Sequence, residues 1–321
     1  MRSAVKHALC SALFVLILAI LLLAVSWVFQ PKGNAARDGI LDQSANGILG
    51  EAEQTIDVLI VGDSETYSSF IPLKIWQDCG ITSYVCATPA QKLYYSSEFL
   101  QKAFAQQTPK LVILETNAVF RNFTYADVVF HNLEQTFSVF RYHNRWKSLQ
   151  PKDFTLYVNN TNTDSSKGYS YNTAVSAANT KGYMKPTKKQ QRISAKNQRY
   201  IEEMQAFCEE NGAAFLLVST PSTKNWNYAR HNSIAALAQQ TGIPYIDMNL
   251  LQKEIPIDWK TDTRDGGDHL NHAGAVKVTD YLTQYLQQTG AFTDKRGDPR
   301  YADWEEALAA FNRATADSLK P

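Results

Sequence analysis

The chain has 321 residues, of which 44 % are hydrophobic, and its formal net charge at pH 7 is +1. This length is enough for one large domain or two small ones, and the near-neutral charge gives no reason to expect a nucleic-acid partner. Four cysteines, none of them in a CxxC spacing, exclude a disulfide scaffold and do not suggest a zinc site.

The chain begins with an apolar segment, residues 8–29, that carries no charge. As an α-helix, a segment of this length can cross a hydrocarbon core of roughly 30 Å. Arg2 and Lys6 precede it, and Trp27 lies near its far end, where an interfacial aromatic anchor is expected. A cleaved signal peptide is the alternative, but the apolar run is long for one and no A-x-A site closes it.

We therefore predict a single-pass protein of the cell membrane. Residues 1–7 form a cytoplasmic tail, residues 8–29 the transmembrane anchor and residues 30–52 a stalk. All later residues are expected outside the cytoplasm, because the short amino-terminal flank favours retention on the cytoplasmic side.

Five short apolar segments that alternate with helical patterns follow the stalk. The expected strands cover residues 56–62, 82–88, 111–117, 213–220 and 243–249, and the expected helices cover 91–107, 190–211, 234–240 and 273–288. Buried strands that alternate with helices indicate an α/β fold, with a parallel sheet covered by helices on both faces. Functional residues of such sheets lie at the carboxyl ends of the strands.

We expect this domain to cover residues 53–292, followed by a helical tail over 293–321. An insertion, 121–189, interrupts the alternation between the third and fourth strands. Long irregular insertions are usually functional loops or disordered segments. In this insertion Tyr142, His143 and Trp146 are suited to binding the face of a sugar, although packing of the insertion onto the core explains the same residues.

The first strand ends in Gly62-Asp63-Ser64, which is either a turn or a nucleophile held at a strand end. A serine nucleophile needs a base. His269 lies in the loop "TRDGGDHLNHAGA", residues 263–275, close after Asp265 and Asp268. A carboxylate that fixes the imidazole tautomer would complete a catalytic triad. We expect Ser64 Oγ within about 2.6–3.2 Å of His269 Nε2, or somewhat farther without a ligand.

These motifs resemble those of the SGNH (GDSL-type) hydrolase family over residues 55–290. Gly62-Asp63-Ser64 matches its first block, Asn117 matches the asparagine of its third block, and His269-Leu270-Asn271 with Gly274 matches its last block. The resemblance implies a three-layer, flavodoxin-like fold, acyl transfer through Ser64 and His269, and no metal or other cofactor.

Two positions depart from the family pattern. Gly266 stands three residues before His269, where the family has an acid, so either Asp265 or Asp268 would complete the triad; we favour Asp265. The second block, "ATPAQ", lacks the glycine whose N–H joins the oxyanion hole. A backbone N–H of Ala90 or Gln91 would then join the N–H of Ser64 and the side chain of Asn117.

The single anchor adds a second resemblance, to membrane-anchored family members such as the D-alanyl transfer protein of teichoic acids and the alginate and peptidoglycan O-acetylation proteins. It implies a serine esterase or O-acyltransferase acting on a cell-envelope polysaccharide or other acylated polymer, with a membrane-bound O-acyltransferase as a candidate partner. The triad does not distinguish hydrolysis from transfer. The alternative is a catalytically inactive SGNH-like envelope protein that binds a polymer or assists assembly.

Overall fold

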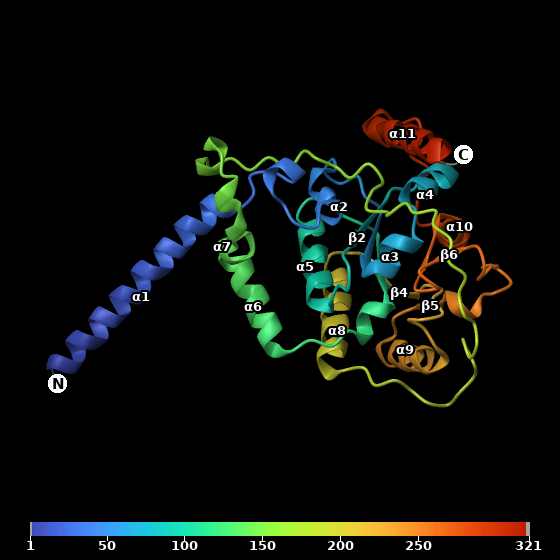
Figure 1. Cartoon of the computed structure of the whole chain (residues 1–321), viewed down its shortest axis with the longest axis horizontal. Coiled ribbons are helices and arrows are strands. Elements are labelled where there is room, and N and C mark those ends of the chain that lie inside the picture. Colours follow the sequence, from blue (N-terminus) through green and yellow to red (C-terminus); the bar gives the residue numbers. More distant parts are fainter. Residues whose placement is uncertain (1, 319–321) are drawn as a thin grey trace. The chain divides into compact units, whose positions relative to one another are not determined.

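The computed structural model describes residues 2–318, and side chains over 3–316. These residues form two compact units (Figure 1). The first contains the chain up to Gln43 together with Phe123–Asn162, and the second contains Ser44–Asn122 together with the chain from Thr163. The segment 121–189, expected as one insertion, is thus divided between the two units.

The first unit is built on the helix α1 (Arg2–Phe29). It is the one helix of the described chain that is long and apolar enough to cross a membrane, with a mean hydropathy of 3.1. None of its apolar window is buried within the protein. An exposed apolar surface of this size is compatible with a single-pass anchor or a signal sequence.

The residues after α1 fold back onto the second segment of the same unit. Arg145 donates to the carbonyl oxygen of Phe29 at 2.6 Å and to Asp153 Oδ1 at 2.6 Å. The first of these bonds satisfies a carbonyl that the end of a helix leaves unpaired. Two helices of this unit, α6 (Tyr125–Thr136) and α7 (Ser138–Tyr142), were not predicted.

The second unit contains a five-stranded parallel sheet in the order β2-β1-β3-β4-β5. Its strands are β1 (Val58–Gly62), β2 (Ser83–Ala87), β3 (Leu111–Glu115), β4 (Ala214–Ser219) and β5 (Tyr245–Asp247). Each lies inside its expected range. This strand order is the flavodoxin-like one, so the expected fold class is confirmed.

Helices cover both faces of the sheet (Figure 1). Alternate side chains of each strand point to opposite faces, so Leu59 and Val61 join one buried cluster while Val58 and Ile60 join the other. The first cluster receives side chains from α5 (Leu93–Phe104), α8 (Ala195–Glu210) and α9 (Tyr228–Thr241). The second receives them from α4 (Pro72–Cys79) and α10 (His272–Thr289).

The remaining elements of this unit are short, apart from the last helix. They are α2 (Gln43–Asn46), which begins at the boundary between the units, α3 (Ser64–Ser69), and the antiparallel pair β6 (Thr263–Arg264) and β7 (His269–Leu270). The last helix, α11 (Ala302–Ser318), lies where a helical tail was expected. Its Trp304 is buried, with a ring centroid 5.6 Å from that of Trp76 on α4.

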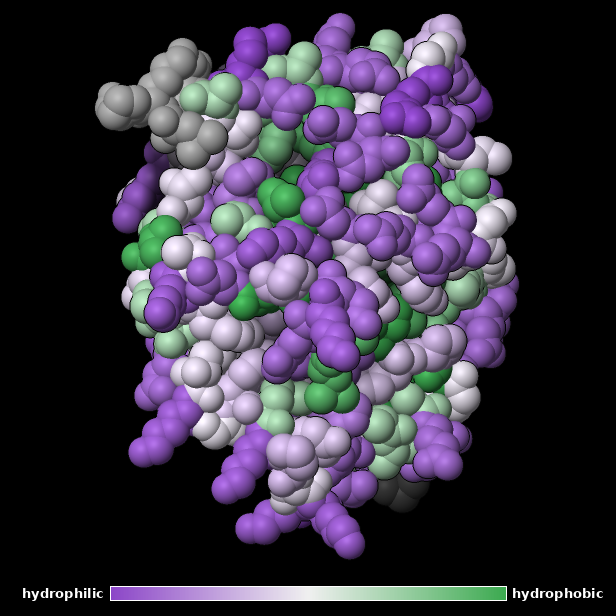
Figure 2. Space-filling view, turned by 90° about the vertical axis from the view of Figure 1, so that its right-hand side faces the viewer, coloured by the Kyte–Doolittle hydropathy of each residue, from purple (hydrophilic) through white to green (hydrophobic). Residues whose placement is uncertain are grey.

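The face shown in Figure 2 is mainly hydrophilic, with apolar residues scattered in small groups. Small scattered groups are ordinary for a protein surface in water.

Candidate active site

Ser64 is the first residue of α3 and directly follows β1, at the carboxyl edge of the sheet. Asp63 caps this helix, because its Oδ1 accepts the N–H of Glu65 at 3.1 Å. A Cβ atom at Gly62 would lie 2.2 Å from Thr66 Oγ1 and 2.9 Å from the Cβ of Glu115. The strand-to-helix turn at Ser64 therefore requires a glycine before the aspartate.

His269 is held by Asp265. The ring Nδ1 lies 3.0 Å from Asp265 Oδ2, and the backbone N–H of His269 donates to Asp265 Oδ1 at 3.0 Å. Asp265, Gly266 and Gly267 have φ angles of 51°, 72° and 85°. Three successive left-handed residues fold the chain back, so that a carboxylate four residues before the ring reaches it.

The glycines of this loop explain the departure from the three-residue spacing. A Cβ at Gly267 would lie 2.2 Å from Thr223 Oγ1 and 2.5 Å from the Cβ of Ala178. Asp268, the other candidate, accepts a hydrogen bond from Asn225 Nδ2 at 2.5 Å instead of one from the ring. His269 thus contacts Asp265 and not Asp268, while the role of Asp265 in a triad stays a prediction.

Ser64 and His269 lie on neighbouring elements, because β7 packs beside α3. The ring Nε2 is buried and has no hydrogen-bond partner among the described residues, so the expected bond to Ser64 Oγ is not formed. Catalytic hydrogen bonds are often long without substrate and tighten in the Michaelis complex. The ring nitrogen that would serve as a base is thus free of other protein groups.

The amide of Asn117 has a fixed orientation. Its Nδ2 donates to Asp63 Oδ2 at 2.9 Å, and its Oδ1 accepts from Arg230 at 2.8 Å. A carboxylate only accepts and a guanidinium only donates, so nitrogen and oxygen cannot be exchanged. One hydrogen of Nδ2 is left for an oxyanion.

The two other expected oxyanion donors differ from each other. Ala90 is exposed in the turn after β2, with a left-handed φ of 53°. Gln91 was a wrong prediction, because its N–H donates to the carbonyl of Thr88 at 3.2 Å and its side-chain amide to Ser96 Oγ at 3.0 Å. Gln91 stabilises this turn from inside and has no N–H left for a ligand.

Tyr142, His143 and Trp146 lie in the first unit, whereas Ser64 and His269 lie in the second. Tyr142 ends α7, and the other two lie in the short helical turn that follows it. Trp146 is 64 % exposed. Their binding of a sugar stays a prediction.

Two buried acids beside Ser64 were not predicted. Burial, reinforced by the charge of Asp63, raises the pKa of Glu115 to about 8. Burial first, and then the charges of Asp63 and Glu115, raises the pKa of Glu65 well above its usual range. Arg121 Nε donates to Asp63 Oδ2 at 2.5 Å and places a positive charge among the three acids. The sequence pattern that could have predicted Glu115 is an acid at the end of an apolar strand.

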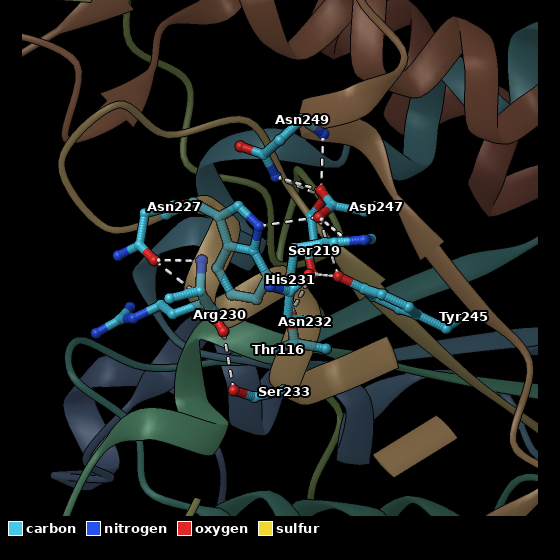
Figure 3. Close-up of polar contacts among 12 residues, drawn as sticks. Thr116, Ser219, Asn227, Arg230, His231, Asn232, Ser233, Tyr245, Asp247 and Asn249 are labelled. Atoms are coloured by element: carbon cyan, nitrogen blue, oxygen red, sulfur yellow. Dashed lines mark hydrogen bonds and ion pairs between the residues drawn. The ribbon is translucent and has the colours of Figure 1, made fainter. Parts of the chain in front are cut away.

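A second histidine–aspartate pair, which was also not predicted, lies at the carboxyl end of β5 (Figure 3). His231 Nδ1 on α9 lies 2.9 Å from Asp247 Oδ2. Asp247 Oδ2 also accepts from Trp226 Nε1 at 3.0 Å and from the Tyr245 hydroxyl at 3.1 Å. Its other oxygen, Oδ1, accepts from Asn249 twice, from the backbone N–H at 2.9 Å and from the side-chain amide at 2.8 Å. The Tyr245 hydroxyl continues to Ser219 and Thr116. This network joins the ends of β3, β4 and β5.

No protein-family model and no curated protein matches the chain. Among solved structures it is similar to a GDSL-like lipase from Bacteroides thetaiotaomicron, at 12 % identity over 73 % of this chain and 88 % of that one, with a TM-score of 0.36. A lipase/acylhydrolase from Enterococcus faecalis is 9 % identical over 73 % and 97 %, with a TM-score of 0.40. A psychrotrophic esterase from Pseudoalteromonas sp. is 9 % identical over 74 % and 99 %, with a TM-score of 0.39.

Proposed function

We propose that this chain is a serine ester hydrolase or O-acyltransferase of the SGNH type. The observation that supports it most is the His269–Asp265 pair, which leaves the ring Nε2 without a partner among the described residues. His269 lies on β7, and β7 packs beside α3, the helix that begins at Ser64. A carboxylate that holds Nδ1–H leaves Nε2 as the proton acceptor.

In the proposed reaction, Ser64 Oγ attacks the ester carbonyl carbon while its proton passes to His269 Nε2. The negative charge on the carbonyl oxygen is stabilised by the N–H of Ser64, the remaining hydrogen of Asn117 Nδ2 and the N–H of Ala90. Collapse of the tetrahedral intermediate breaks the ester bond, and His269 returns the proton to the leaving alcohol. Water or a sugar hydroxyl then attacks the acyl-serine, with His269 again as the base.

The substrate we propose is an acyl ester of a cell-envelope glycan or a teichoic-acid-like polymer. The support is α1, whose exposed apolar surface suits a membrane, together with the resemblance to membrane-anchored family members. In this arrangement α1 is an uncleaved anchor, residues 1–7 lie in the cytoplasm and the second unit lies outside. A membrane-bound O-acyltransferase that passes acyl groups outward is the proposed partner.

A second candidate is an inactive SGNH-like protein that binds envelope polymer. It is favoured by one observation, the unmade hydrogen bond between Ser64 and His269.

Labelling by a fluorophosphonate probe separates the two candidates. We expect the probe to label the wild-type chain and Ser69→Ala, but not Ser64→Ala. Ser69 lies on the same helix and is buried, and its hydroxyl has no hydrogen-bond partner among the residues that the structure describes, so it is a matched control. Hydrolysis of a small acetyl ester should fall at least about 10³-fold in Ser64→Ala, with an unchanged melting temperature. Equal labelling of all three chains would refute the proposal that the chain is an enzyme with Ser64 as its nucleophile.

A further inference from the structure

Three potential metal ligands lie together beside Ser64. One carboxylate oxygen each of Glu65 and Asp268 and a ring nitrogen of His269 all lie within 4.8 Å of one another. Glu65 is the second residue of α3, and the other two belong to the loop and strand at β7. The proposed triad uses His269 alone of these three.

Two atoms of this cluster are buried and unpartnered. Glu65 is 1 % exposed, and its Oε2 has no hydrogen-bond partner among the described residues. The Nε2 of His269 has none either. Buried polar atoms without a partner are rare because their lost hydration is not replaced. Both atoms are therefore available to a ligand that enters the cluster.

Asn225 holds the two carboxylates side by side. Its Nδ2 donates to Glu65 Oε1 at 2.6 Å and to Asp268 Oδ1 at 2.5 Å. Each carboxylate keeps its second oxygen for another partner. A cation placed between the two carboxylates is attracted by both of them.

The Asp265 contact suits His269 equally well as a metal ligand. Metal-binding histidines usually donate their other ring N–H to a carboxylate, which fixes the tautomer and leaves the second nitrogen for the ion. In this structure Asp265 Oδ2 lies 3.0 Å from Nδ1 and so leaves Nε2 for the ion.

We propose that Glu65, Asp268 and His269 bind a Zn²⁺ ion, and that the bound ion switches off ester chemistry at Ser64. One imidazole and two carboxylates suit Zn²⁺, whose bonds to such ligands are about 2.0–2.2 Å long. The zinc-bound Nε2 can no longer accept a proton from Ser64. The proposed Zn²⁺ binding depends on the ligand geometry alone, whereas the proposed inhibition of ester chemistry rests on the proposed function.

The test is calorimetric titration of the full-length chain in detergent with ZnCl₂. We expect one Zn²⁺ per chain, with affinity at least tenfold weaker in Glu65→Gln and in Asp268→Asn. Glu254→Gln is the control, because Glu254 is an exposed acid that is not one of the three proposed ligands. Melting curves of each variant verify folding, and because Asp268 is less buried than Glu65, its variant is the safer one. Equal affinity in the wild type, Glu65→Gln and Asp268→Asn overturns the site.

Ester hydrolysis in the same samples tests the inhibition. We expect Zn²⁺ to abolish hydrolysis at saturation, and EDTA to restore it. Full activity of a Zn²⁺-saturated chain overturns the inhibitory role. If the chain binds Zn²⁺ through these residues but shows neither hydrolysis nor probe labelling in EDTA, the proposed enzyme fails while the zinc site stands.

Discussion

The second unit contains two histidine–aspartate pairs of nearly equal geometry and very different surroundings. The Nδ1–oxygen distance is 3.0 Å in His269–Asp265 and 2.9 Å in His231–Asp247. The Asp265 side chain is 46 % exposed, whereas that of Asp247 is 3 % exposed. The distance alone therefore does not distinguish the pair that we propose to be catalytic from the pair that connects strands.

The difference lies in what else each pair contacts. The carboxylate oxygens of Asp265 accept from His269 alone among the described residues, while those of Asp247 also accept from Trp226, Tyr245 and Asn249 (Figure 3). The far nitrogen of His269 is free beside the start of α3, whereas the rings of Tyr228 and Tyr245 pack against that of His231. One pair orients a single ring, and the other connects strands.

The largest expected effect on turnover comes from replacing each of the two histidines in a separate variant. His269→Asn should lower kcat for a small acetyl ester at least about 10³-fold, because the variant lacks the imidazole that accepts the Ser64 proton in the proposed reaction. His231→Asn should keep kcat within a few fold. The measurement is steady-state hydrolysis by the two purified variants with equal melting profiles. A larger loss in His231→Asn than in His269→Asn would reverse the roles of the two pairs.

The second largest effect distinguishes the two aspartates, because one replacement should change turnover and the other stability. Asp265→Asn should lower kcat by roughly 10²–10⁴-fold, because an amide can hold the wrong tautomer, and it should leave the melting temperature almost unchanged. Asp247→Asn should instead lower the free energy of unfolding by about 2–4 kcal/mol, because it disturbs several buried hydrogen bonds. Rates and denaturant midpoints of both variants check this.

Asp268→Asn is the control for the Asp265 variant. Its carboxylate contacts Asn225 and not Nδ1, so it should retain far more activity. Wild-type turnover in Asp265→Asn would remove its proposed role.

The alternation of apolar strands with helices was enough to predict the sheet, because burial on both faces of a strand leaves a continuous apolar run. The pairing of His269 with a loop carboxylate was also predictable from adjacency in the sequence. The His231–Asp247 pair was not, since the two residues lie on different elements and their ring and carboxylate meet only after folding. Glu65, at the start of a helix, and Gln91, in a turn, show the same limit, because the sequence does not distinguish a buried polar residue at such a position from an exposed one.

The smallest expected effect concerns stability and Glu115, whose hydrogen bonds reach toward both histidine–aspartate pairs. Glu115 Oε2 accepts the N–H of Asn117 at 2.9 Å in the Ser64 site, and its Oε1 accepts the hydroxyl of Thr220 at 3.2 Å, next to Ser219 of the other network. Burial raises its pKa from 4.5 to about 8. The folded chain therefore keeps a proton on Glu115 at pH values where the unfolded chain has lost it.

The sign of the pH dependence follows from this proton. Between about pH 4.5 and pH 8 the folded state binds more protons than the unfolded state, so the contribution of Glu115 to stability falls as the pH rises and then levels off. Glu115→Gln has no proton to lose, so its stability should fall less than that of the wild type between pH 5 and pH 8. Denaturant unfolding of both chains at pH 5, 6.5 and 8 measures the difference, with the exposed Glu254→Gln as the control. Parallel curves for wild type and Glu115→Gln would show that the pKa of Glu115 is the same in the folded and the unfolded chain.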